Sequence, residues 1–138
     1  MFSVIIPTYN NIEYLKILIT SIKKNSKFNH EIIVHVNEGA DGTLDYVKKN
    51  KIKYTYSDIN IGLCSATNMA ASKSTTEYIL YTHDDMYFCP GWDEALLDEV
   101  NKIDTNSYYI SGTMIEQSSG HIQLDCGSNY LDFNEKLL

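Results

Sequence analysis

The chain has 138 residues, the length of one domain, and its hydrophobic fraction of 43% and charged fraction of 21% exclude a disordered protein. Its net charge of −7 argues against a nucleic-acid binder, which needs a basic face to replace phosphate counterions. An acidic chain that binds a phosphorylated ligand would need a divalent cation to offset the repulsion.

Strands and helices are predicted to alternate along the chain. Apolar and β-branched runs predict strands, in chain order, at residues 2–6, 31–36, 52–57, 78–81, 108–114 and 121–126. Helical spacing of apolar residues predicts helices between them, at residues 12–22, 41–47, 62–73 and 90–103. The strand at 78–81 is expected to be buried, and the last two strands are expected to be joined by a turn at 118–120.

Polar residues and prolines predict where these elements begin and end. Pro7 is expected to end the first strand, and Asn10 with Glu13 resembles a capping box at the start of the next helix. Asp41 is expected to cap the second helix, and Pro90 to occupy the first position of the fourth.

This alternation predicts an α/β fold with a mainly parallel, Rossmann-like sheet in a three-layer α/β/α sandwich. Residues 1–138 are expected to form a single domain. In such a sheet the ligand lies beyond the carboxyl ends of the strands, where the strand order reverses. The loops that follow the strands are therefore the places to look for chemistry.

Polar loop residues follow four of the predicted strands. They lie at residues 7–10, 37–43, 60–62 and 83–85. Each segment alone is as well explained by a turn or a helix cap, because Asn, Gly and Asp are common in loops. Their placement at successive strand ends favours one shared site.

The acidic pair Asp84 and Asp85 carries the strongest signal, since it directly follows a predicted buried strand. Buried carboxylates are costly unless they are solvated, paired or bound to a metal. Mg²⁺ and Mn²⁺ prefer oxygen ligands, few from the protein and the rest from phosphate and water. An ordinary acidic turn is the alternative interpretation.

An ordered series of short motifs resembles family 2 glycosyltransferases over residues 2–100. The motifs are Ile5-Ile6-Pro7-Thr8-Tyr9-Asn10, Glu31-Ile32-Ile33-Val34, Asp41-Gly42-Thr43, Asn60-Ile61-Gly62 with Asn68, Glu77-Tyr78-Ile79-Leu80 before the acidic pair, and Pro90-Gly91-Trp92. The resemblance implies a GT-A fold, a nucleotide-diphosphate sugar donor, by preference UDP-linked, and Mn²⁺ or Mg²⁺ as cofactor. It also implies that the chain is the first part of a longer enzyme.

The resemblance also assigns roles to particular residues. The implied donor nucleotide-binding residues are Pro7, Thr8, Tyr9, Asn10, Asn37, Glu38, Asp41, Asn60, Gly62, Asn68, His83 and Asp84. Asp85 takes the last position of the DxD motif, the direct metal ligand, and His83 takes the first, where the family has Asp. His83 could instead be a turn residue. The loop at 37–40 also departs from the family's Asp-Asp-Gly-Ser.

No residue aligns with the family's catalytic base, which stays unknown. The carboxylates after Asp85 are Asp93, Glu94, Glu116 and Asp125, and the first two are expected to lie in the first turn of a helix. A non-catalytic nucleotide-sugar-binding module and a nucleotidyltransferase are the alternatives to a glycosyltransferase. A nucleotidyltransferase would need a basic, Gly-rich loop after the first strand, and residues 7–10 are not one.

The expected partners are a nucleotide-diphosphate sugar and an acceptor of unknown class, whether glycan, lipid or protein, with no nucleic acid. The sequence has neither a basic signal-peptide start nor an apolar run long enough to span a membrane. Its three cysteines lack metal or redox spacing, and His30, His35 and His121 are expected to be structural. These features predict a cytoplasmic protein and leave open a peripheral contact with a membrane.

Overall fold

The computed structural model describes residues 1–105 and 107–138. These form two compact units, Met1–Pro90 and Gly91–Leu138, and each is considered by itself. The expectation of a single domain over residues 1–138 stays a prediction.

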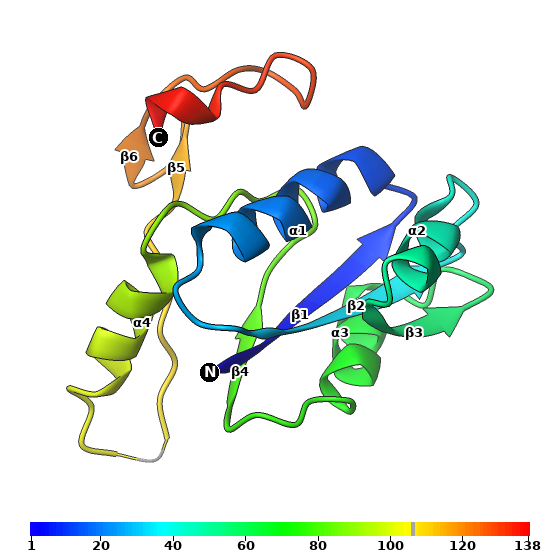
Figure 1. The fold of residues 1–138 in the computed structure, drawn as a ribbon, viewed down its shortest axis with the longest axis horizontal. Coiled ribbons are helices and arrows are strands. Elements are labelled where there is room, and N and C mark those ends of the chain that lie inside the picture. Colours follow the sequence, from blue (N-terminus) through cyan, green and yellow to red (C-terminus); the bar gives the residue numbers. More distant parts are fainter. Residues whose placement is uncertain (106) are drawn as a thin grey trace. The chain divides into compact units, whose positions relative to one another are not determined.

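The first unit is built on a four-stranded parallel sheet (Figure 1). Its strands are β1 (Phe2–Tyr9), β2 (Glu31–Asn37), β3 (Lys53–Ser57) and β4 (Tyr78–Tyr81), in the spatial order β3-β2-β1-β4. Ile5 in β1 lies opposite Ile33 in β2 and Tyr81 in β4. All four strands run in one direction, so their carboxyl ends share one edge.

Three helices cover the two faces of this sheet. They are α1 (Ile12–Asn25), α2 (Thr43–Lys49) and α3 (Leu63–Ala71). Right-handed crossovers in this strand order place α1 and α2 on one face and α3 on the other (Figure 1). The predicted three-layer, Rossmann-like α/β arrangement is confirmed.

The core lies between these layers and follows the alternation of the strands. Ala70 of α3 packs against Ile5 and Ile33, so the small residues of α3 allow the helix to approach the sheet closely. Because side chains alternate between faces, the neighbouring residues of these strands point to the α1 side. There α1 contributes four residues that are at most 2% exposed: Leu15, Leu18, Ile19 and Ile22.

Pro7 does not end β1, as the sequence suggested, but lies inside it. It is opposite His35 of β2, and the strand continues to Tyr9. The Ile5 carbonyl accepts a bond from the Thr82 N–H. The backbone N–H and C=O groups of odd-numbered residues in β1 therefore point toward β4. The regular pairing with β4 ends at Ile5, so no ladder bond is lost where Pro7 lacks an N–H.

The predicted helix caps need correction. The N-cap of α1 is Asn11, and the first N–H of the helix donates to Asp41 Oδ2 at 2.8 Å. Glu13 does not form the predicted capping box but pairs with Lys16 at 2.8 Å. The chain turns at Asn10, whose φ of +48° leaves its side chain facing the 38–40 loop instead.

Asp41 and the strand β4 also differ from the predictions. Gly42 is the N-cap of α2, and Asp41 Oδ1 accepts bonds from the Thr43 N–H and hydroxyl. β4 has the predicted bounds but is an edge strand, with Ile79 55% and Tyr81 42% exposed, so the expected burial is wrong. A short apolar run does not distinguish a central strand from an edge strand.

The second unit has less regular structure than predicted. Its helix α4 (Trp92–Val100) begins after Gly91, not at Pro90, because Gly91 adopts a φ of +78° as N-cap. Asp93 and Glu94 lie in the first turn, as expected. The described residues of this unit form strands only at β5 (Ile115–Glu116) and β6 (Ile122–Gln123), followed by the 3₁₀ helix η1 (Glu135–Leu137).

The prediction of two strands at 108–114 and 121–126, joined by a turn, is wrong in its bounds. β5 and β6 pair in parallel over two residues each, and the predicted strand at 108–114 is absent from the described residues. Gly120 explains the path between them. A Cβ at this position would lie 2.8 Å from the Met114 carbonyl oxygen and 2.7 Å from the Glu116 nitrogen, so the chain folds back too closely for a side chain.

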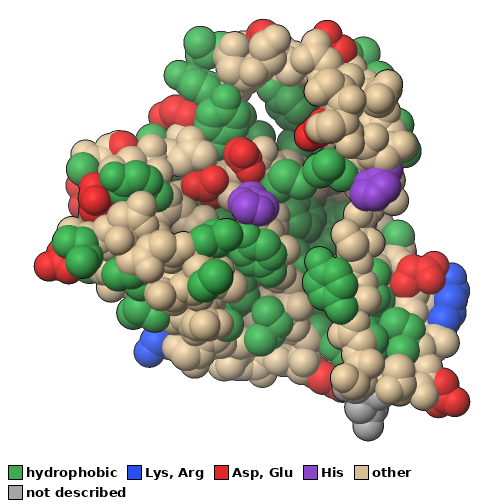
Figure 2. All heavy atoms as spheres, turned by 180° about the vertical axis from the view of Figure 1, so that it is seen from behind, with side chains coloured by type: hydrophobic (Ala, Val, Ile, Leu, Met, Phe, Trp, Pro, Cys, Tyr) green, Lys and Arg blue, Asp and Glu red, His purple; other side chains and the backbone are tan. Residues whose placement is uncertain are grey.

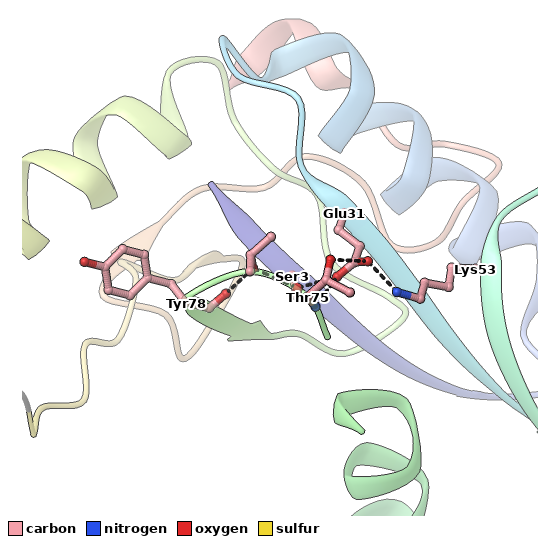
Figure 3. A network of polar contacts seen from close by, with 6 residues as sticks. Ser3, Glu31, Lys53, Thr75 and Tyr78 are labelled. Atoms are coloured by element: carbon pink, nitrogen blue, oxygen red, sulfur yellow. Dashed lines mark hydrogen bonds and ion pairs between the residues drawn. The ribbon is translucent and has the colours of Figure 1, made fainter. Parts of the chain in front are cut away.

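A polar network ties the amino ends of the strands together (Figure 3). Glu31 of β2 accepts bonds from the Lys53 ammonium of β3 at 2.5 Å, the Ser3 hydroxyl of β1 at 2.5 Å, and Thr75 before β4. Partial burial alone would raise the pKa of Glu31, but these donors outweigh it and lower the pKa to about 2. Glu31 therefore stays charged at neutral pH.

Basic side chains are sparse on the face shown in Figure 2, in keeping with the net charge of −7. Along the part of the chain that the structure describes, no helix combines the length and the hydropathy needed to cross a bilayer.

Candidate functional site

An open cleft of about 440 Å³ lies at the carboxyl edge of the sheet in the first unit. It is formed by the ends of β1, β2 and β4 and by the start of α3. The lining residues are Pro7, Thr8, Tyr9, Asn10, Asn11, Asn37, Asn60, Gly62, Leu63, His83 and Asp84. Segments that are far apart in the sequence thus meet where the strand order reverses, as predicted from the strand-helix alternation.

Asp84 is the acidic residue that faces the cleft. Its Oδ2 accepts a bond from the Thr8 hydroxyl at 2.6 Å, and its Oδ1 accepts from the Asn11 amide at 3.1 Å. Thr8 itself is only 2% exposed. One side chain of β1 and one at the start of α1 therefore hold this carboxylate in one orientation without neutralising its charge.

Asp85, the predicted metal ligand, is exposed and does not line the cleft. The chain beyond it is anchored to α1, because Asn25 donates to the Phe88 carbonyl at 2.7 Å and the Phe88 N–H donates to the Ser21 hydroxyl at 3.0 Å. The turn with both carboxylates is thus fixed on one side by β4 and on the other by α1.

His83 lines the cleft and is exposed. Its Nε2 lies 3.2 Å from the Tyr81 hydroxyl, and the two rings meet edge to face at 5.4 Å. Burial raises the pKa of Tyr81, and the nearby groups Cys64, Asp84 and Asp85 raise it further. The neutral Tyr81 hydroxyl can therefore donate to His83.

Asn37 is a buried link between three segments of the cleft wall. Its amide donates to the Thr8 carbonyl at 3.2 Å. Its Oδ1 accepts from the Ile61 N–H at 3.0 Å and from the Ser57 hydroxyl at 3.2 Å. With 3% exposure, Asn37 shapes the cleft by fixing neighbouring backbone.

The loop after β2 lies beside the end of β1. Asn10 accepts from the Ala40 N–H at 2.9 Å and donates to Glu38 at 3.3 Å. Burial alone would raise the pKa of Asp41, but bonds from Thr43 and from the Ile12 N–H outweigh it and lower the pKa. Neither Glu38 nor Asp41 lines the cleft, and both contribute to the loop that supports Asn10.

The loop after β3 leads into α3 at the cleft. Asn60 Oδ1 accepts from the Gly62 N–H at 2.9 Å, and Gly62 has a φ of +79°, which favours glycine. The N-cap Gly62 offers no side chain to cap α3, and the helix begins at Leu63, which lines the cleft. Asn68 is exposed farther along α3 and does not line the cleft.

Sequence reasoning missed Asn11 and Leu63, which also line the cleft. Asn11 directly follows the Pro7–Asn10 motif, and an amide at that position is a usable signal for a bond to the acidic turn. Leu63 carries no chemical signal in the sequence, because its place in the cleft follows from the start of α3.

A divalent metal would find few protein ligands here. Among the described residues, no group of three or more His, Cys, Asp or Glu side chains is arranged to hold a metal ion. Asp84 is the carboxylate that lines the cleft, and the exposed Asp85 follows it; carboxylate oxygens are ligands that Mg²⁺ and Mn²⁺ prefer. Asp84 still has accepting capacity, because a carboxylate can accept about four bonds.

Comparisons with known proteins agree with this fold. Residues 3–136 match Glycosyl transferase family 2. An uncharacterized glycosyltransferase of Rickettsia conorii is 36% identical over 118 residues, 81% of this chain and 19% of that protein. The poly(ribitol-phosphate) beta-N-acetylglucosaminyltransferase TarS of Staphylococcus aureus is 32% identical over 93 residues, 62% of this chain and 16% of that protein.

The crystal structure of S. aureus TarS 1–349 in complex with UDP is a solved neighbour. It is 28% identical with a TM-score of 0.61, and the match covers 82% of this chain and 38% of that one. The fold is an α/β architecture of the GT-A type. The chain belongs to glycosyl transferase family 2, and it spans 19% to 38% of the length of the first curated relatives that it matches.

Proposed function

We propose that the cleft binds a nucleoside-diphosphate sugar, with UDP as its nucleotide, and that the chain provides the donor side of a glycosyl transfer. The observation that carries this proposal is the meeting of four strand-end segments around one open cleft at the reversal of strand order. Family membership and the likeness to a solved glycosyltransferase structure with UDP support it.

The geometry suggests how the donor would lie. Tyr9 is 49% exposed beside Asn10, and this pair would contact the base and ribose. The first turn of α3, which begins at Leu63, has no side-chain cap, and a helix N-terminus favours phosphate oxygens. A diphosphate between this helix start and Asp84 would be attracted by the helix start and repelled by the Asp84 carboxylate.

That carboxylate is the reason to propose a metal. Asp84 and Asp85 would hold Mg²⁺ or Mn²⁺, with His83 beside them. The bound cation would neutralise the diphosphate and stabilise the nucleotide as it leaves. The bonds from Thr8 and Asn11 orient Asp84 for this role.

Calorimetry with UDP tests the proposal, first with Mn²⁺ and then with a chelator. We expect Asp84→Asn to weaken UDP binding in the presence of Mn²⁺ and Asp85→Asn to weaken it as well. Asp45→Asn, on the exposed side of α2, is the matched control and should bind as the parent protein does. UDP binding that is equal with and without Mn²⁺ would refute the metal, and undetectable UDP binding would refute the cleft assignment.

A further inference from the structure

A line of hydrogen-bonded polar groups, of which His35 and Asn37 are buried, runs from the middle of the sheet to the cleft. It begins at His35 of β2, which is fully buried at 0% exposure between apolar strand neighbours. Its Nδ1 lies 2.7 Å from the Thr55 hydroxyl and its Nε2 lies 3.1 Å from the Ser57 hydroxyl, both on β3. A buried imidazole is costly unless its ring nitrogens are hydrogen-bonded, and these two hydroxyls give each nitrogen a partner.

The neighbours of Ser57 decide which ring nitrogen carries the proton. The Ser57 hydroxyl has one proton and lies 2.8 Å from the Ile59 carbonyl and 3.2 Å from Asn37 Oδ1, and neither oxygen can donate. The proton of Ser57 is therefore directed at these acceptors, and its lone pair faces His35. It follows that His35 Nε2 carries the proton and that Nδ1 accepts from the Thr55 hydroxyl.

The same serine connects the imidazole to the cleft wall. Ser57 fixes the Ile59 carbonyl and, through Asn37, shares an acceptor with the Ile61 N–H. Asn60 and Gly62, which line the cleft, lie within and directly after this anchored stretch. The orientation of the Ser57 hydroxyl therefore bears on the position of the whole loop.

We propose that His35 is a positioning residue for nucleotide binding, which in its Nε2–H form orients Ser57 and so holds the 58–62 loop against the cleft. The proposal rests on the proposed function of that cleft. His35 interrupts an otherwise apolar stretch of β2, where Ile33, Val34 and Val36 are all 0% exposed. Burial lowers the pKa of His35, with a smaller opposing effect of Asn37, so the neutral form persists at neutral pH.

Two substitutions at this position separate positioning from packing. His35→Val keeps a β-branched, apolar strand residue but removes both bonds. His35→Gln can donate to Ser57 through its amide and accept from Thr55 through its carbonyl. Val34→Ala is the control, since it removes buried apolar volume from the same strand without touching the polar line.

We expect His35→Val to weaken UDP binding about tenfold, the size of one lost neutral hydrogen bond, and to speed amide exchange of Ile61 by a similar factor. His35→Gln should restore both quantities to within about threefold, because it remakes the bond to Ser57. Val34→Ala should lower the unfolding midpoint but change neither quantity. Parental UDP affinity and Ile61 exchange in His35→Val would overturn the proposal.

Two further measurements keep the result unambiguous. If the parent protein does not bind UDP, the proposed function fails, and Ile61 exchange without ligand still decides the role of His35. If His35→Val does not fold, ¹⁵N NMR of the parent imidazole decides. A protonated Nε2 and a bare Nδ1 are expected, and a protonated Nδ1 would overturn the proposal.

Discussion

The two edges of the same parallel sheet use polar side chains in opposite ways. At the amino edge, Glu31 is surrounded by donors from both neighbouring strands and carries an ammonium partner, Lys53, at 2.5 Å. At the carboxyl edge, Asp84 is held by a hydroxyl and an amide, neither of which carries charge. The neutralised edge holds the strands together, while the edge with an uncompensated charge is suited to bind a ligand.

The largest effect should come from truncating the amino-edge network. Glu31→Ala leaves the partners on β1 and β3 without their shared acceptor, and we expect it to cost about 3 kcal/mol of unfolding free energy. UDP affinity of the folded fraction should not change, because the cleft lies at the other edge. Urea unfolding and calorimetry measure the two quantities, and a loss of affinity at unchanged stability would contradict the division between the edges.

Acid should remove the same stabilisation in the parent protein. The pKa of Glu31 is lowered to about 2 in the folded state from 4.5, so the unfolded chain takes up its proton first as pH falls. Stability from this group is therefore complete above pH 4.5 and is lost between pH 4.5 and 2. The loss should be about 2 kcal/mol after allowance for the solvent exposure of the ion pair.

Glu31→Gln is the control for this pH dependence. It keeps the shape of the side chain but does not titrate, so its stability should fall less steeply over the same pH range. Parallel stability curves for Glu31→Gln and the parent protein would show that other carboxylates dominate acid unfolding.

At the carboxyl edge we expect substitutions to change UDP affinity more than the free energy of unfolding. Thr8→Val removes the shortest bond to Asp84, and we expect UDP binding with Mn²⁺ to weaken about tenfold, or about 1.4 kcal/mol, because the carboxylate loses its orientation. The free energy of unfolding should change by less than about 1 kcal/mol, because Val is β-branched like Thr and is favoured in strands. Titration of UDP against both proteins checks the affinity. A large fall in stability would mean that Thr8 stabilises the fold, as Glu31 does at the amino edge.

The smallest effect is expected at His83. His83→Asp adds a negative charge beside the proposed cation, and we expect Mn²⁺ binding to tighten about threefold while stability is unchanged. Mn²⁺ titration followed by electron paramagnetic resonance measures this, with His121→Asp in the second unit as a control. Unchanged Mn²⁺ affinity would leave His83 as a turn residue paired with Tyr81.

Much of this arrangement could be predicted from the sequence. The apolar runs located β1 to β4, and the polar motifs at their ends located most of the cleft, because both depend on local composition and on the common direction of parallel strands. The resemblance to family 2 glycosyltransferases was confirmed by the match over residues 3–136.

What could not be predicted depends on contacts between distant segments. The sequence motif indicated Asp85 as the metal ligand, but it could not show that Thr8 and Asn11 hold Asp84, and not Asp85, at the cleft. The start of α1 is fixed by Asp41, 29 residues away, so a local capping pattern was misleading. The roles of the predicted site residues and the metal stay predictions.

Pro7 has a consequence for how the sheet could change in evolution or in the laboratory. Because it offers no N–H toward β4, an extension of β4 past residue 82 would lack one ladder hydrogen bond at that position. Pro7 thus disfavours further pairing of β1 with β4 beyond Ile5. A residue that lacks a backbone donor can in this way help to keep the cleft edge of the sheet open.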